Sequence, residues 1–126
     1  MKYALVTGGS RGIGKAVCLK LAQTGHHVVI NYRSNHEEAQ NTLKEITDKG
    51  GSGELLPFDV ADVKDIEKVL GGWIDQSKSP IEVLVNNAGI NKDNLMIWMK
   101  PEEWSTIIDT NLNSFFYITR LVLKDM

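Results

Sequence analysis

The sequence predicts an α/β fold in which helices cover both faces of a parallel sheet, the doubly wound arrangement. Short apolar runs alternate along the chain with segments of helical periodicity. The turn after the first apolar run is rich in glycine, as expected where a strand leads directly into a helix. The chain has 126 residues, of which 42% are hydrophobic, and this suits a single domain.

Four runs rich in apolar and β-branched residues are predicted to be strands: 3–6, 27–31, 54–58 and 81–86. The second is apolar on both faces, as a strand buried between two helix layers should be. Pro57 cannot donate a backbone hydrogen bond, so the third strand is expected at an edge. We expect three layers and the strand order 3-2-1-4.

Helices are predicted after each strand from the spacing of apolar residues. In the first helix these are Ile13, Val17 and Leu21, followed by a glycine stop at Gly25. The second is predicted to begin with a capping box formed by Ser34 and Glu37.

The third helix is expected to begin at Asp62 as its cap and to continue through Ile74. Gly71 and Gly72 lie within it, and close backbone packing is the expected reason for them. The last helix, from Pro101 to Leu123, is apolar around most of its circumference, which predicts two buried faces.

Composition excludes several classes of protein. With 14 basic and 16 acidic residues the net charge is −2, whereas nucleic-acid-binding domains usually carry a basic surplus. No apolar run approaches the roughly 18 residues of a membrane span. Cys18 is the only cysteine, and the three histidines lack ligand spacing, so neither a disulfide nor a metal site is expected. No signal peptide precedes the first strand, and we expect a cytoplasmic protein.

The glycine-rich turn runs Thr7-Gly8-Gly9-Ser10-Arg11-Gly12-Ile13-Gly14. Glycines at such a turn allow close approach of a ligand, and free amides at the helix start attract phosphate, so a dinucleotide pyrophosphate is the expected ligand. A purely structural turn is the alternative. The turn lacks the Gly-Lys-Ser/Thr ending of a P-loop, which disfavours nucleoside triphosphate hydrolysis.

This turn and the later segment Asn86-Asn87-Ala88-Gly89 resemble two motifs of the short-chain dehydrogenase/reductase family. The similarity to this family covers the whole chain. The resemblance implies a Rossmann-type fold and an oxidoreductase. Residues 91–96, 99–100, 102–104 and 110–112 are most similar to the family's 3-oxoacyl-acyl-carrier-protein reductases. Related acetoacetyl-CoA and sugar reductases share much of this last pattern.

The cofactor is predicted to be NADP(H). The segment 31–35, which follows the second strand, contains no acidic residue to accept from a ribose hydroxyl. Instead Arg33, with Ser34 and with Arg11 from the glycine turn, is expected to hold a 2′-phosphate. Alternatively, Arg33 is a solvated loop cation and Ser34 only a helix cap.

The resemblance implies further cofactor contacts. Asp59 and Val60 match the family's adenine-contacting pair, although an Asp in this position also suits a simple turn. Asn87, Ala88 and Gly89 match the turn that lines the adenine ribose in relatives. The full predicted cofactor set is Gly8, Gly9, Ser10, Arg11, Gly12, Ile13, Gly14, Arg33, Ser34, Asp59, Val60, Asn87, Ala88 and Gly89.

In the family, a Tyr-x-x-x-Lys pair and a preceding Ser carry out proton transfer to the substrate. Tyr3, Tyr32 and Tyr117 are not followed by Lys four positions later, so no such pair is present. The catalytic group that the resemblance does assign is Asn111, which supports a proton relay in relatives; an ordinary polar helix residue is the alternative.

The predicted activity of the complete protein is NADPH-dependent reduction of a 3-oxoacyl thioester, carried on acyl carrier protein or CoA, to the 3-hydroxyacyl form. The alternatives are another short-chain dehydrogenase acting on a sugar or alcohol, or, for residues 1–126 alone, a non-catalytic dinucleotide-binding module. Residues 1–126 are expected to be the N-terminal, NADP-binding half of a larger single-domain fold, with the fourth strand and its following helix as the last elements of this half. By resemblance the complete protein is expected to be a homo-oligomer, a tetramer in relatives.

Overall fold

The computed structural model describes residues 2–10, 12–77, 79–87, 100–108 and 112–124. Within them, four parallel strands form one sheet in the order β3-β2-β1-β4, which confirms the predicted order. The strands are β1 (Tyr3–Val6), β2 (His27–Tyr32), β3 (Ser52–Pro57) and β4 (Ile81–Val85). β3 lies at an edge, as the proline at its end predicts.

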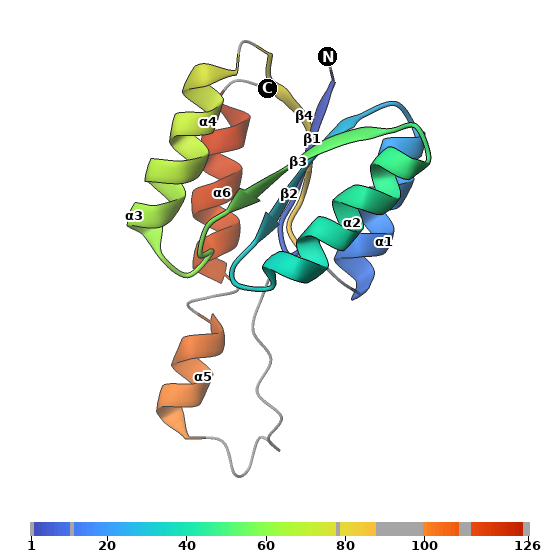
Figure 1. Cartoon of the computed structure of the whole chain (residues 1–126). Coiled ribbons are helices and arrows are strands. Elements are labelled where there is room, and N and C mark those ends of the chain that lie inside the picture. The colour runs from blue at the N-terminus through green and yellow to red at the C-terminus, as the bar shows by residue number, and fades with distance from the viewer. Residues whose placement is uncertain (1, 11, 78, 88–99, 109–111, 125–126) are drawn as a thin grey trace.

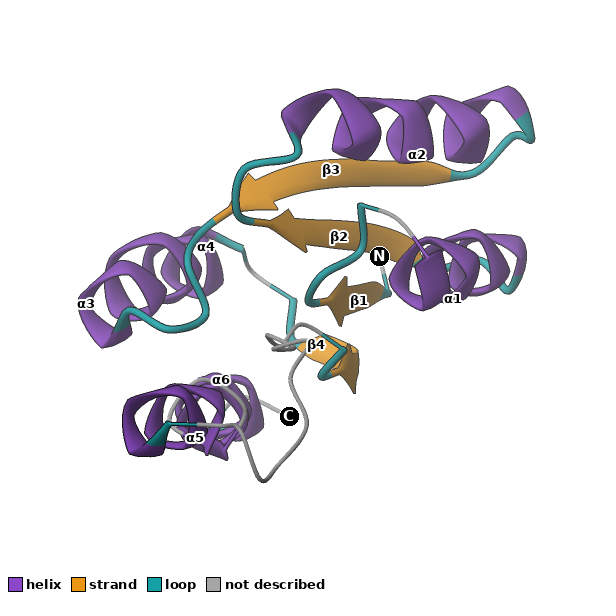
Figure 2. Ribbon diagram, turned by 90° about the horizontal axis from the view of Figure 1, so that it is seen from below, coloured by secondary structure: helices purple, strands orange, loops and turns teal. Residues whose placement is uncertain are grey.

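Helices cover both faces of the sheet and give the predicted three layers (Figures 1 and 2). α1 (Gly12–Gln23) and α2 (His36–Asp48) lie on one face. On the other face a continuous helical segment, formed by α3 (Val63–Asp65), η1 (Ile66–Leu70) and α4 (Gly71–Gln76), lies beside α6 (Ser114–Leu123). α5 (Pro101–Ile108) precedes α6.

The two central strands are buried on both faces, which explains why their sequences are continuously apolar. Leu5 and Val29 face one hydrophobic cluster, with Ile66, Leu70 and Ile118 from the helices on that side. Val6, Val28 and Ile30 face a second cluster with Cys18 and Ile46 from α1 and α2. These five strand residues are fully buried, and so is Ala4 of β1.

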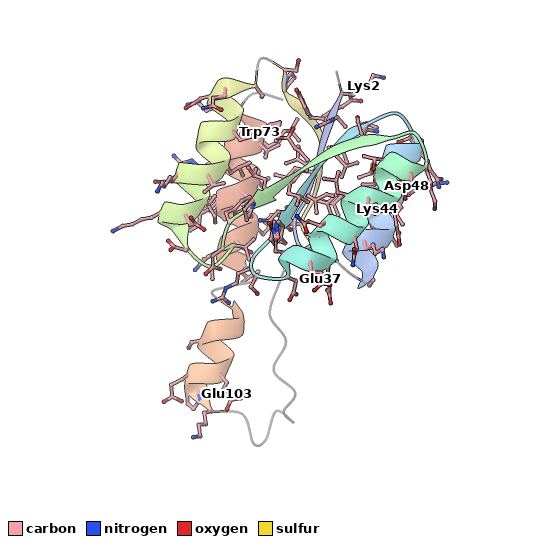
Figure 3. The ribbon with its side chains drawn as sticks, in the orientation of Figure 1. Lys2, Glu37, Lys44, Asp48, Trp73 and Glu103 are labelled. Atoms are coloured by element: carbon pink, nitrogen blue, oxygen red, sulfur yellow. The ribbon has the colours of Figure 1, made fainter. Side chains whose placement is uncertain are left out.

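Aromatic and polar side chains pack together at the amino-terminal ends of the strands. Trp73 of α4 packs edge-on against Tyr3, with 4.9 Å between the ring centroids, at the end of the molecule where Lys2 lies (Figure 3). Its indole Nε1 donates to Oε1 of Glu54 at 2.7 Å, and Oε2 of Glu54 pairs with His27 at 2.8 Å. This group therefore lies at the edge opposite the carboxyl ends of the strands.

Two helix boundaries follow the sequence prediction. α1 is followed by Gly25 with φ of +91°, a conformation that favours glycine. The Asp62 side chain accepts from the backbone amides of Lys64 and Asp65 at the start of the third helical segment.

The predicted capping box of Ser34 and Glu37 is wrong. The cap of α2 is Asn35, one residue later, and no side chain bonds to the first-turn amides there. This shift puts Glu37 at the second helical position, one residue before the place from which a capping-box carboxylate reaches back. The Ser34 carbonyl instead accepts from the amide of His36 at 2.9 Å.

The third helix also differs from the expectation. Its middle, Ile66–Leu70, is a π-helix, and a spacing of apolar residues does not distinguish this from an α-helix. Close packing does not explain Gly71 and Gly72, because a Cβ atom at either position would meet no other atom within 4 Å.

Of the predicted last helix, the part described as α6 is buried on one face in this single chain, and its second buried face stays a prediction. Ser114, Ile118 and Val122 of α6 face the sheet. On the other side Phe115 is 55% exposed and Phe116 54% exposed, because the described residues supply no further layer over them.

Candidate dinucleotide site

The candidate site lies at the carboxyl ends of the parallel strands, where the glycine turn connects β1 to α1. β1 has a neighbour on each side, and the connections that leave β1 and β2 pass over the opposite face from those that leave β3. This change of direction is the position at which doubly wound sheets bind ligands. The turn is therefore at the point where the topology predicts a site.

Two glycines of the turn adopt backbone conformations that other residues disfavour. Gly8 has φ of +65° and Gly12 has φ of +61°. Gly12 also begins α1, and a Cβ atom there would meet nothing within 4 Å, so the start of the helix is open. An open helix start with free backbone amides is a favourable place for a phosphate group.

Gly14 is required for a different reason, which is close contact. A Cβ atom at Gly14 would lie 2.1 Å from the carbonyl oxygen of Gly8 and 2.7 Å from Nδ2 of Asn87. Here the helix packs directly on the turn, and the inner face of α1 begins at Gly14 and Cys18. Ile13, predicted to face the core, is 76% exposed as a consequence and lies at the open helix start.

Asn87 and Thr7 join the turn to the end of β4. The Asn87 amide donates to Oγ1 of Thr7 at 3.0 Å, and its side-chain Nδ2 donates to the Gly8 carbonyl at 3.1 Å. The Thr7 amide donates to the carbonyl of Val85 at 3.0 Å. Asn87, which the family resemblance assigns to the turn that lines the adenine ribose, thus also holds the glycine turn in place.

Cys18 lies beneath the turn as a buried thiol. Its Sγ donates to the Gly9 carbonyl at 3.8 Å, and a Cβ atom on Gly9 would lie 2.8 Å from that sulfur. Burial raises the pKa of Cys18 from its ordinary 9.0 to about 12. The thiol therefore stays protonated, acts as a donor and is not a nucleophile at neutral pH.

Arg33 and Asp59 face each other across the ends of β2 and β3. The Arg33 Nε and Asp59 Oδ2 are 3.6 Å apart, and the Arg33 side chain is 73% exposed. An ion pair this exposed contributes about 1 kcal/mol or less, so an incoming phosphate can recruit the guanidinium at small cost. The other Asp59 oxygen accepts from the Ala61 amide at 2.9 Å, which is the turn role considered as the alternative.

The structure brings most of the described predicted residues to one edge of the sheet. Ser10 is buried there, Ser34 is exposed beside Arg33, and Val60 packs against the core behind Asp59. Arg11, Ala88, Gly89 and Asn111 lie outside the described residues, so their predicted roles remain predictions.

Sequence reasoning missed two polar residues that build this site, Asn31 and Thr42. Both are fully or almost fully buried, and both bond to the glycine turn. A signal was available: Asn31 interrupts an otherwise apolar buried strand, and Thr42 occupies a position on the apolar face of its helix between Ala39 and Ile46. A buried polar side chain requires a hydrogen-bond partner, and here the partners are backbone groups of the turn.

This donor set fits a phosphorylated dinucleotide. The open start of α1 offers backbone amides for a pyrophosphate, and Arg33 offers an exposed cation at the end of the neighbouring strand β2. Among the described residues, no group of three or more His, Cys, Asp or Glu side chains is arranged to hold a metal ion. None of the helices in the described part of the chain is long and apolar enough to cross a membrane.

Fold and site together define a dinucleotide-binding α/β protein. Comparison with family models gives the short chain dehydrogenase family, which matches residues 2–126. The chain belongs to this family of short-chain dehydrogenases and reductases.

Its curated relatives include 3-oxoacyl-[acyl-carrier-protein] reductase FabG of Staphylococcus aureus strain Mu50, 44% identical over 115 residues, or 91% of this chain and 46% of the relative. A 3-oxoacyl-[acyl-carrier-protein] reductase of Synechocystis sp. is 44% identical over 125 residues, 99% of this chain and 50% of the relative. The chain thus spans about half the length of these relatives.

Two solved structures resemble this fold closely. A metagenomic short-chain oxidoreductase crystallised with NADP gives a TM-score of 0.89 at 33% identity, over 99% of this chain and 55% of that one. A dehydrogenase/reductase from Sinorhizobium meliloti 1021 gives a TM-score of 0.90 at 30% identity, over 99% of this chain and 49% of that one.

Proposed function

We propose that this chain is the NADP(H)-binding part of a reductase that converts 3-oxoacyl thioesters, on acyl carrier protein or CoA, to 3-hydroxyacyl thioesters. The observation that carries the cofactor choice is Arg33, an exposed guanidinium at the end of β2 in a segment without an acidic residue. The substrate class is supported by the names of relatives that are 44% identical to this chain.

In this proposal the start of α1, with Gly12 and Ile13, binds the pyrophosphate. Arg33 and Ser34, with Arg11, bind the 2′-phosphate, since a guanidinium makes strong charge-assisted bonds to phosphate oxygens. Asp59 and Val60 contact the adenine. The reduced nicotinamide, when bound, supplies the hydride that reduces the carbonyl.

The proton needed by the developing alkoxide has to come from a positioned acid. Tyr3, Tyr32 and Tyr117 do not have the Tyr-x-x-x-Lys spacing that performs this step in the family. In residues 1–126 the proposed contribution to the relay is Asn111. We therefore expect residues 1–126 alone to bind the cofactor without ketone-dependent oxidation of NADPH, and measurable turnover would contradict this division of roles.

A homo-oligomer is part of the proposal. The exposed face of α6, with Phe115, Phe116 and Leu123, is supportive because exposed aromatic side chains in one patch mark contact surfaces.

The experiment follows NADPH absorbance with the complete protein, using acetoacetyl-CoA as the thioester probe. We expect thioester-dependent oxidation, and little with a ketose or a simple ketone at the same concentration. Activity on the ketose or on an alcohol, without activity on the thioester, would favour the alternative of a sugar or alcohol dehydrogenase. A protein that binds NADPH and reduces none of these compounds would favour the non-catalytic module.

A further inference from the structure

Asn31 is a buried polar residue at the end of β2, and its exposed fraction is only 1%. Its side-chain Oδ1 accepts from the amide of Gly8 at 3.3 Å. Its Nδ2 donates to the carbonyl of Leu56 at 3.2 Å and to the carbonyl of Phe58 at 3.1 Å. Its own carbonyl accepts from the amide of Gly9 at 3.0 Å. One residue therefore bonds to the glycine turn on one side and to the end of β3 on the other.

An asparagine suits this position because its two ends have opposite hydrogen-bonding character. The amide nitrogen offers the donors that two carbonyls need, and the oxygen offers the acceptor that Gly8 needs. An aspartate would present an oxygen to the carbonyls of Leu56 and Phe58, and an apolar side chain would leave all three backbone groups without this partner. Buried groups left unpaired are costly, so the local structure depends on the amide.

The contacts of Asn31 determine which turn amides remain for a ligand. The amides of Gly8 and Gly9 are occupied by Asn31. A phosphate at this turn is therefore limited to the amides nearer the helix start, beyond Gly9. On the other side, Phe58 directly precedes Asp59, the residue that pairs with Arg33. Asn31 thus connects the two ends of the site.

A second buried contact holds the turn from the side of α2. Oγ1 of Thr42, which is fully buried, lies 2.9 Å from the carbonyl of Ser10 and 3.1 Å from that of Glu38. Asn31 fixes the first half of the turn and Thr42 its middle, so the turn is held in position from within the protein. Such preorganisation reduces the conformational entropy that the turn would otherwise lose when a ligand binds, and this favours binding.

We propose that Asn31 is a positioning residue for the cofactor: it sets the distance between the pyrophosphate-binding turn and the adenosine end of the site. This inference rests on the proposed NADP(H)-binding function. Asn31 touches neither cofactor nor substrate in this scheme, and its effect is transmitted through Gly8 and through the Phe58–Asp59 segment. Its loss is expected to weaken cofactor binding and to leave the chemical step intact.

The test compares the Asn31→Ala variant with the Val28→Ala variant in the complete protein. Val28 is a fully buried residue near the start of the same strand, in the cluster under α1 and α2, and its apolar side chain cannot form a hydrogen bond to the turn. It is the control for a general loss of stability. KM for NADPH, kcat and the dissociation constant of NADPH are measured well below the unfolding temperature of each variant.

We expect Asn31→Ala to raise KM and the dissociation constant for NADPH about tenfold, equivalent to about 1.4 kcal/mol, with kcat within about twofold of wild type. Val28→Ala should leave both constants within about twofold. If Asn31→Ala does not accumulate as folded protein, Asn31→Ser takes its place, because a hydroxyl is too short to span from Gly8 to Phe58.

Three outcomes would overturn the inference. Unchanged KM in the Asn31 variant, with wild-type protein that binds NADPH, rejects the positioning role alone. An equal rise in KM for Val28→Ala shows that lost stability is the cause. Wild-type protein that does not bind NADPH rejects the proposed function and the inference with it.

Discussion

Replacing Gly14 by alanine tests the close contact between α1 and the glycine turn. The added Cβ would lie 2.1 Å from the Gly8 carbonyl oxygen and 2.9 Å from its carbon, whereas ordinary carbon–oxygen contacts are about 3.3 Å or more. The Gly8 backbone cannot withdraw easily, because Asn31 and Asn87 hold its amide and its carbonyl. The atoms that must move are therefore backbone atoms.

The expected effect of Gly14→Ala is a loss of about 3 kcal/mol in the free energy of unfolding, the upper part of the usual range for overpacked sites. Gly71→Ala is a matched control, since it is the same chemical change within a helix. At Gly71 φ is −59° and a Cβ atom would meet nothing within 4 Å. We expect this variant to be more stable than wild type by about 0.5–1 kcal/mol.

Urea denaturation followed by far-ultraviolet circular dichroism measures both changes, read as a shift in midpoint at constant slope. The two variants should differ in opposite directions from wild type. If Gly14→Ala is within about 1 kcal/mol of wild type, the steric reasoning is wrong. If Gly71→Ala is strongly destabilised, the inference that a Cβ atom fits without contact at Gly71 is wrong.

Three further predictions concern single side chains. Arg33→Ala should weaken NADPH binding about tenfold and leave NADH within about twofold, because only NADPH carries the 2′-phosphate; fluorescence titration measures both, and equal losses would contradict the role. Cys18 keeps its proton in the folded state to a pKa of about 12 but loses it near 9.0 when unfolded, so the unfolded state binds fewer protons in between. The stability of wild type relative to Cys18→Ala should therefore fall by about 1.4 kcal/mol per pH unit above pH 9, and a constant difference would refute this. Asp62→Ala should lower the unfolding free energy by about 1 kcal/mol through loss of its cap, whereas Asp48→Ala, at an exposed ion pair with Lys44, should change it by less than about 0.5; equal effects would contradict the capping role.

The fold was predictable because the information for it is local. β1 and β2 are buried on both faces and are therefore apolar at every position from Ala4 to Val6 and from Val28 to Ile30. Pro57 alone placed β3 at an edge. Together with the glycine stops, these patterns indicated the layers, whereas the strand order came from the Rossmann-type fold class.

Details that depend on distant groups were not predictable. The start of α2 moved from Ser34 to Asn35, although Ser34 and Glu37 have the spacing of a capping box, because backbone contacts fix that boundary. The π-helix at Ile66–Leu70 keeps both of these residues fully buried, as an α-helix of similar pattern also would. Apolar spacing alone carries too little information to separate such cases.

The site was predictable in part. The glycine motif located the turn, and the position of Arg33 after β2 located the cation. The roles of Asn31 and Thr42 were not predictable, because their partners lie 23 and 32 residues away in the sequence. The pairing of Arg33 with Asp59 likewise requires β2 and β3 to be adjacent.

The measurement that tests the central claim most directly is a titration of the complete protein with NADPH and with NADH, followed by nicotinamide fluorescence. The account predicts that NADPH binds at least about tenfold more tightly, because the exposed guanidinium of Arg33 has a 2′-phosphate partner only in that cofactor. Equal binding of NADH and NADPH, or binding of neither, would contradict the assignment of this strand end as an NADP(H) site.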